Sequence, residues 1–174
     1  DALAPLEPPR ELLLFVSART TAIGGEVVLI LDESAPDLVD SLSDVMLALL
    51  DKQAALPPLI LLDLRCSRDE VPADLARLAL TAGQVDGAVV IAFVGFGDGA
   101  QPSPLTAALL NEIAAAGVAA ITADDLVFNL RRRFAGATNG ALACSAPPDG
   151  FVFLPKVVAA PAEQSEPEDS EGGE

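Results

Sequence analysis

The sequence predicts an α/β protein, a three-layer sandwich in which a mixed, mostly parallel sheet carries helices on both faces. Short apolar runs, clearest at residues 58–64, stop abruptly on polar side chains, as strands buried on both faces do. Segments with apolar residues at three- and four-residue spacing alternate with these runs, which predicts helices between the strands. The 174 residues, 51% of them hydrophobic, are enough for one domain with its own core.

The first half of the domain is expected to hold a hairpin followed by a helix. The elements are a strand over residues 11–17, a turn over 18–25, a strand over 26–31 and a helix over 37–56. The two strands are so close in sequence that they predict a hairpin. Pro57 and Pro58 end the helix, because proline disfavours helical backbone in the residue before it.

The second half alternates strands and helices. The predicted strands are residues 59–64, 87–95 and 151–154, and the predicted helices follow caps at Ser67, Ser103 and Thr122. Asp69 and Glu70 would lie in the first turn of the helix that Ser67 opens and Gly83 ends. The other two helices are expected over residues 104–116 and 123–134. The strand–helix–strand order implies parallel neighbours joined by right-handed crossovers.

The domain is expected to span residues 11–156. Residues 1–10 are proline-rich and predict an extended arm. Residues 157–174 are rich in Pro, Glu and Ser and predict a disordered acidic tail.

The charge balance excludes several classes of partner. A net charge of -16 argues against nucleic acid, whose phosphates need Lys and Arg. No apolar run approaches the roughly 18–20 residues of a membrane span, so we expect a soluble protein of the cytoplasm or an organelle interior, with any targeting peptide removed. The chain has no His, the commonest acid–base residue and zinc ligand. We therefore expect no metal and no cofactor.

Three groups of residues are candidate sites. Cys66, flanked by Arg65 and Arg68 at an expected helix start, has the setting of a thiol with a lowered pKa, although a small buried Cys is the simpler interpretation. Asp32 and Asp63 follow apolar strands and would act as paired carboxylates, or simply cap a helix or pair with an arginine. Residues 95–99 have the composition of a phosphate-binding loop without its spacing.

Arg131, Arg132 and Arg133 end the last predicted helix. We interpret them as favourable charges at the C-terminus of that helix.

The ordered set of segments resembles the caspase-like fold of cysteine peptidases, in particular bacterial caspase homologues and metacaspases. Residues 12–20 (LLLFVSART) are similar to the strand that ends on the family's catalytic His, and residues 61–68 (LLDLRCSR) to the strand that carries its catalytic Cys. Further similarity lies in residues 26–32, 88–93, 103–110, 122–126 and 151–155.

The departures from the family fall on its catalytic positions. Arg19 stands where the His should be, and Arg65 stands where the nucleophile should be, with Cys66 one residue late. Ala18 and Thr20 replace the family's glycines beside the His, and Arg68 replaces another. Acyl transfer needs a thiolate and an imidazole within hydrogen-bond reach, so the resemblance implies a pseudo-peptidase.

The resemblance also implies a protein partner. The family has a strand and helices before the His strand, for which this chain has no room at its front. We expect another chain to supply that half, or the strand at residues 12–16 to present an unpaired edge for strand pairing.

The leading hypothesis is therefore a catalytically inactive caspase-like domain that serves as a scaffold or regulatory subunit, with an active or complementary caspase-like chain as partner. The first alternative is a cysteine peptidase that uses Cys66 with a base from a partner chain. The second is a small-ligand or nucleotide-binding domain that uses residues 95–99.

Overall fold

The computed structural model describes residues 13–31, 34–35, 38–51, 59–85, 88–97, 103–117, 119–146 and 152–154. The predicted arm at residues 1–10 and the tail at 157–174 lie outside these ranges, as does Asp32. Within these ranges the strands are β1 (Leu14–Ile23), β2 (Glu26–Ile30), β3 (Val39–Ser41), β4 (Leu59–Cys66), β5 (Val89–Phe96), β6 (Ile121–Thr122), β7 (Gly140–Cys144) and β8 (Val152–Leu154). The helices are α1 (Leu42–Asp51), α2 (Pro72–Ala82), α3 (Pro104–Ala116) and α4 (Ala123–Phe134).

Six strands form one sheet in the order β3-β2-β1-β4-β5-β7. β1, β4 and β5 are parallel neighbours, whereas β2 pairs antiparallel with β1, and β7 antiparallel with β5. β3 is antiparallel to β2 and so runs in the same direction as the central strands. The predicted mixed, mostly parallel sheet is confirmed.

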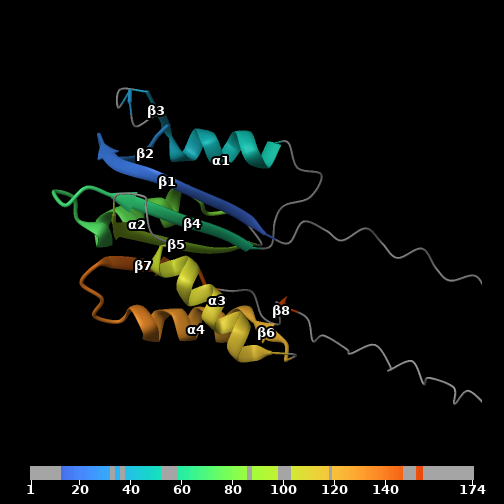
Figure 1. Cartoon of the computed structure of the whole chain (residues 1–174). Coiled ribbons are helices and arrows are strands. Elements are labelled where there is room, and N and C mark those ends of the chain that lie inside the picture. Colours follow the sequence, from blue (N-terminus) through green and yellow to red (C-terminus); the bar gives the residue numbers. More distant parts are fainter. Residues whose placement is uncertain are drawn as a thin grey trace, which may run out of the picture.

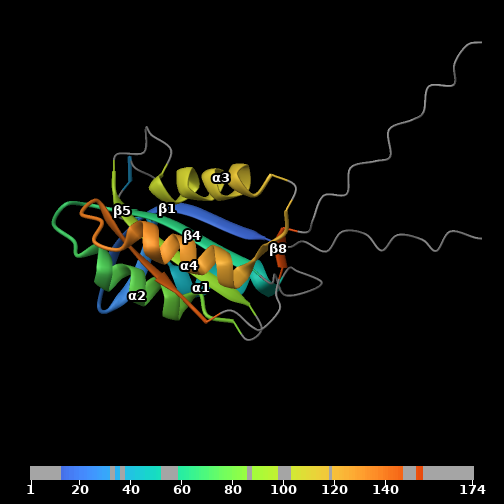
Figure 2. The same cartoon turned by 90° about the horizontal axis from the view of Figure 1, so that it is seen from below.

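Helices cover both faces of this sheet, which confirms the predicted three-layer sandwich (Figure 1, Figure 2). α1 and α2 pack on one face, where Leu42, Met46 and Leu75 join a core with alternate residues of β4 and β5. α3 and α4 pack on the other face, where Leu105 and Leu126 join a second core.

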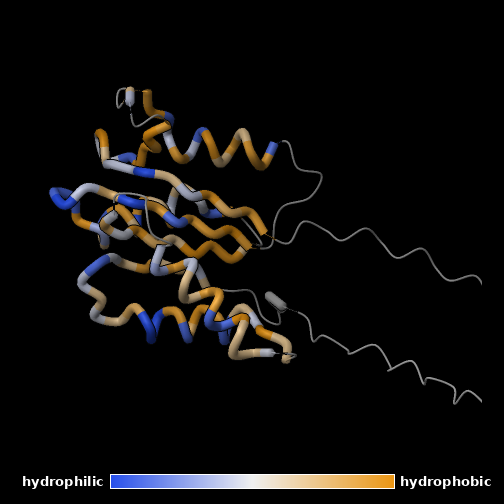
Figure 3. Tube along the Cα trace, viewed as in Figure 1, coloured by the Kyte–Doolittle hydropathy of each residue, from blue (hydrophilic) through white to orange (hydrophobic). Residues whose placement is uncertain are grey.

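The central strands are apolar along most of their length, because both of their faces are covered. All eight residues of β4 except Arg65 are buried, and in β5 all except Phe96. Figure 3 shows this apolar band, and it shows hydrophilic residues gathered where β4 leads into α2. A run of buried residues that ends on polar ones is what sequence patterning predicts for central strands.

The predicted first strand and turn were placed too early. β1 continues through Ala18 to Ile23, and the turn is confined to Gly24 and Gly25, whose φ values of 63° and 87° favour glycine. The stretch after Ser17 contains two threonines, which suit a strand. The predicted hairpin is confirmed, since Ile23 lies opposite Glu26.

The helix predicted over residues 37–56 is shorter in the structure. Val39–Ser41 forms β3 at the edge of the sheet instead, paired with β2, and α1 begins only at Leu42. Residues 52–58 lie outside the described part of the chain. The backbone of Val39–Ser41 hydrogen-bonds to β2, and this pairing is more favourable than the helix that the apolar spacing of these residues predicts.

The predicted cap at Ser67 is wrong. α2 begins at Pro72, its N-cap is Val71, and no side chain caps it. A helix from Ser67 would have placed Pro72 in its interior, where proline breaks the hydrogen-bond pattern, whereas proline is favoured in the first turn. Gly83 does end the helix, as predicted.

The later elements agree with prediction. Ser103 caps α3 by accepting a hydrogen bond from the backbone N–H of Thr106, and Thr122 caps α4 in the same way through Asp125. The strand predicted over residues 151–154 is present as β8, paired with β6. β3, β6 and β7 were not predicted.

β1 is paired unevenly along its two edges. β4 accompanies it from Leu14 to Arg19, but β2 accompanies it only from Arg19 to Ile23. Beyond that point β2 turns away, and the N–H of Leu31 donates to the carbonyl of Leu38. Within the described residues, the edge of β1 opposite β4 therefore has no partner strand between Leu14 and Ala18.

Among the helices of the described residues, none is long and apolar enough to cross a membrane.

Candidate functional site

The parallel strands bring together Arg19 and Arg65, which are far apart in the sequence. β1 and β4 pair with Arg19 opposite Arg65 and Ser17 opposite Asp63. Because side chains alternate along a strand, these four residues lie on one face of the sheet. This is the α3 face, since Asp63 is hydrogen-bonded to residues at the start of α3. The carboxyl ends of parallel strands are where ligand crevices form in such sheets.

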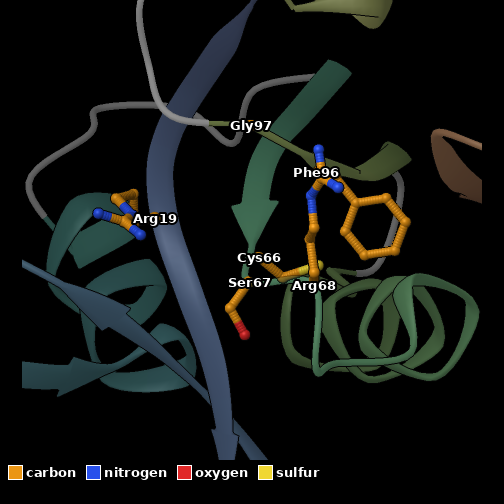
Figure 4. Close-up of a pocket in the computed structure, with 6 residues that line it drawn as sticks. All are labelled: Arg19, Cys66, Ser67, Arg68, Phe96 and Gly97. Carbon is orange, nitrogen blue, oxygen red and sulfur yellow. The ribbon is translucent and has the colours of Figure 1, made fainter.

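A cavity of about 290 Å³ opens at this end of the sheet. Its walls come from the middle of β1, from the ends of β4 and β5 and from the segment after β4 (Figure 4). The residues that line it are Arg19, Cys66, Ser67, Arg68, Phe96 and Gly97. In Figure 4 the side chain of Arg19 lies on one side of β1, whereas Arg68 extends from the end of β4 toward Phe96.

Cys66 does not have the environment of a reactive thiol. It is 4% exposed, and by alternation it faces the α1–α2 core, away from Arg65. Burial raises the pKa of the Cys66 thiol, the negative charge of Glu70 raises it further, and a backbone hydrogen bond acts in the opposite direction. The lowered pKa that the flanking arginines suggested is therefore wrong, and the thiol is held in its protonated form.

Glu70 belongs to a local network beside the cavity. Its Oε1 accepts hydrogen bonds from the Thr21 hydroxyl and, at 3.4 Å, from the Ala22 N–H. The carboxylate therefore fastens the segment after β4 to the far end of β1. It serves here as a tether, and not as the first-turn residue of α2 that the sequence predicted.

Asp63 is buried and tied to α3. Its Oδ2 accepts hydrogen bonds from the Ser103 hydroxyl and, at 3.1 Å, from the Thr106 hydroxyl. The side chain is 1% exposed, and its Oδ1 is buried without a hydrogen-bond partner among the described residues. Asp63 thus joins the central strand to the start of a helix, where negative charge is favourable.

The proposed pairing of Asp63 with Asp32 is not tested, because Asp32 lies outside the described ranges. The simpler interpretation, in which Asp63 binds at a helix start, agrees with the structure. Sequence reasoning identified Ser103 only as a cap. A buried carboxylate in mid-strand needs a donor, and the spacing of Ser103 and Thr106 at a helix start is the sequence signal for that donor.

The glycines of residues 95–99 have structural explanations where they are described. Gly95 lies within β5, and a Cβ there would come within 2.7 Å of the Phe93 ring. Gly97 lies at the cavity, where a Cβ would meet only the Cδ of Arg65, at 3.8 Å. Residues 98–100 lie outside the described ranges.

One of the three arginines at the end of α4 connects the helix to the sheet. Arg131 donates to the carbonyl of Cys144 at 3.1 Å, and the guanidinium of Arg132 lies 6.0 Å from the centre of the Phe128 ring. All three arginines lie in the last turn of α4, as predicted. Burial raises the pKa of Cys144 to about 11, although Arg131 acts to lower it.

A scan against protein-family models, a search of curated proteins and a search of solved structures each found no match to this chain.

Proposed function

We propose that this chain is a non-catalytic caspase-like domain that acts as a scaffold or regulatory subunit of a protein complex. The observation that carries the proposal is the direct pairing of Arg19 with Arg65 across two parallel strands. These are the two positions that the resemblance assigns to the catalytic His and Cys. An arginine side chain stays protonated in proteins, so neither residue can act as a base or a nucleophile.

The pairing also supports the alignment behind the resemblance. A catalytic nucleophile and its base must lie within hydrogen-bond reach. Arg19 and Arg65 were assigned to these roles from separate segments of sequence, and they are neighbours at the carboxyl edge of the sheet. The nearby thiol, Cys66, is turned to the opposite face and buried.

The assignment is tested by rebuilding the pair. In the double variant Arg19→His, Arg65→Cys, we expect the introduced thiol to react with iodoacetamide at pH 7 about tenfold faster than in Arg19→Gln, Arg65→Cys, because a neighbouring imidazole lowers a thiol pKa and a neutral amide does not. The matched control adds Arg133→His, on the exposed end of α4, to Arg19→Gln, Arg65→Cys. Equal rates in all three proteins would contradict the assignment of the two positions.

The open edge of β1 supports an interaction role. Between Leu14 and Ala18 this edge has no partner strand in the described part of the chain, and Leu13 and Phe15 beside it are 45% and 46% exposed. Unpaired strand edges bind extended segments through main-chain hydrogen bonds. With a net charge of -16, two copies of this chain repel each other, which favours a strand from a different protein.

The interaction is tested on the complex purified from its source. We expect native mass measurement to show a heteromer with a caspase-like or complementary chain, and hydrogen exchange to show residues 14–18 more protected in it than in the isolated chain. Phe15→Lys should weaken the complex, whereas Phe128→Lys, at a 64%-exposed position on α4, should not. A monomer without a partner, or equal effects of the two variants, would rule out this interface.

A further inference from the structure

Arginines are concentrated at the cavity in a chain that is otherwise strongly acidic. The whole sequence has 10 Lys and Arg against 26 Asp and Glu. Two of these cations, Arg19 and Arg68, line the cavity, and Arg65 borders it beside Gly97. Such a local reversal of charge attracts anions to a cleft.

Elsewhere in the described residues, several arginines have clear structural partners. Arg77 pairs with Asp74, Arg131 donates to a backbone carbonyl, and Arg132 lies over an aromatic ring. Within the same part of the chain, Arg65 and Arg68 make no hydrogen bond and no ion pair.

The position of Arg65 also has an electrostatic cost. It lies directly opposite Arg19 on the neighbouring strand, and both side chains are partly buried. Like charges at paired positions destabilise a sheet, and partial loss of water strengthens their repulsion. An anion bound beside Arg65 would offset the charge of that residue.

From this arrangement we propose that the cavity binds a small ligand that carries two oxyanion groups, either phosphates or carboxylates. Guanidinium groups bind both kinds of group through paired hydrogen bonds. In Figure 4 the side chain of Arg19 lies to one side of β1, and that of Arg68 lies beyond the end of β4, which suits two separated charges better than one. Ser67 supplies a hydroxyl donor and Phe96 an apolar wall.

This inference is independent of the proposed scaffold role. It needs neither the caspase-like resemblance nor a partner chain. A volume of about 290 Å³ suits a compact ligand, since pockets for drug-sized molecules begin at roughly 300 Å³.

The test is calorimetric titration of the full chain with sodium pyrophosphate and, separately, with sodium succinate, at pH 7 and constant ionic strength. Saturable one-site binding of either anion supports the proposal, and the one that binds more tightly identifies the ligand's oxyanion as phosphate or carboxylate. No binding of either anion at millimolar concentration would overturn the proposal.

Three variants locate the site. Arg68→Gln and Arg65→Gln should each weaken binding about tenfold, the effect of losing one charged hydrogen bond. Arg133→Gln makes the same charge change on the exposed end of α4 and should leave the affinity within about twofold, the size of a screened long-range effect. Equal losses in all three variants would mean unspecific attraction and would overturn the site. Arg68 is exposed, so its variant should fold normally, which thermal unfolding checks.

Discussion

Cys66 illustrates how alternation along a strand decides the chemistry of a residue. Its neighbour Arg65 faces α3, whereas Cys66, although it also lines the cavity, joins the core under α1 and α2. The resemblance aligns the nucleophile with position 65, and the thiol stands one position later. A shift of one position along a strand moves a side chain to the opposite face of the sheet. The thiol of Cys66 is therefore on the other face from the one on which Arg19 and Arg65 are neighbours.

Cys66 is accordingly expected to be unreactive in the folded chain. At pH 7.5 its reaction with iodoacetamide should be slower than that of Cys144, because Cys66 is buried whereas Cys144 is partly exposed. Burial raises the pKa of both thiols, so the difference in their rates reports access to the sulfur. Peptide mass spectrometry after timed alkylation measures both rates, with the urea-unfolded chain as reference. Faster modification of Cys66 than of Cys144 would revive the enzyme hypothesis.

Ser103 is the second residue whose role can be measured. Its hydroxyl both caps α3 and donates to buried Asp63, so Ser103→Ala should lower the free energy of unfolding by about 2–3 kcal/mol, more than a cap alone. Thr122→Ala is the matched control, since partly exposed Thr122 caps α4 without touching a buried carboxylate, and it should cost about 1 kcal/mol. Equal costs in urea unfolding would show that the contact with Asp63 adds nothing.

Among the elements, β7 is held against β5 by a contact between two glycines. A Cβ on Gly140 would come within 2.6 Å of the Phe93 ring and 2.8 Å of the Val94 carbonyl oxygen. Gly140 lies opposite Gly95 in this pair. The antiparallel edge therefore depends on the absence of side chains at this crossing.

Gly140→Ala should destabilise the fold by about 2–3 kcal/mol, because the backbone at the contact cannot move aside freely. Gly97→Ala should change stability by less than about 0.5 kcal/mol, since the Cβ would meet a single flexible side chain at 3.8 Å. Thermal or urea unfolding of the two variants gives the comparison. A Gly140→Ala protein as stable as Gly97→Ala would contradict the tight packing of β7.

The elements that sequence predicted best are those whose local signals agree with their packing. β4 and β5 are buried on both faces and read as apolar runs, and α3 and α4 carry hydroxyl caps. β7 could not be predicted in this way, because its sequence GALAC has little strand preference and its place is set by the contact of Gly140 with β5.

The candidate site was predictable in part. The end of the central strand indicated where a crevice would lie, and the crevice is there. The pairing of Arg19 with Arg65 depends on a register that distant segments determine together. The opposite orientation of Cys66, by contrast, follows from two-residue periodicity and was available from sequence.

At the scale of the whole molecule, the unusual composition lets the two cysteines determine how the free energy of unfolding changes at alkaline pH. The chain has no Tyr and no His, and its two lysines are Lys52 and Lys156. Between about pH 8 and 10, Cys66 and Cys144 are therefore the main side chains of the described residues that can lose a proton. Both are held protonated by burial in the fold, which links folding to alkaline pH.

The free energy of unfolding should consequently fall as pH rises above about 8.5, the ordinary pKa of a free thiol. Both folded pKa values are raised, so the stabilisation is complete below that pH and is lost as pH rises toward about 11, the folded pKa of Cys144. Cys144 alone should account for about 2 kcal/mol of loss at pH 10. Urea unfolding at pH 7.5 and pH 10 measures this difference.

The double variant Cys66→Ala, Cys144→Ala should be less stable at pH 7.5 because of the lost packing, but its stability should depend less on pH. An equal decline in both proteins would assign the alkaline transition to other groups, such as Lys52 and Lys156, and not to the buried thiols.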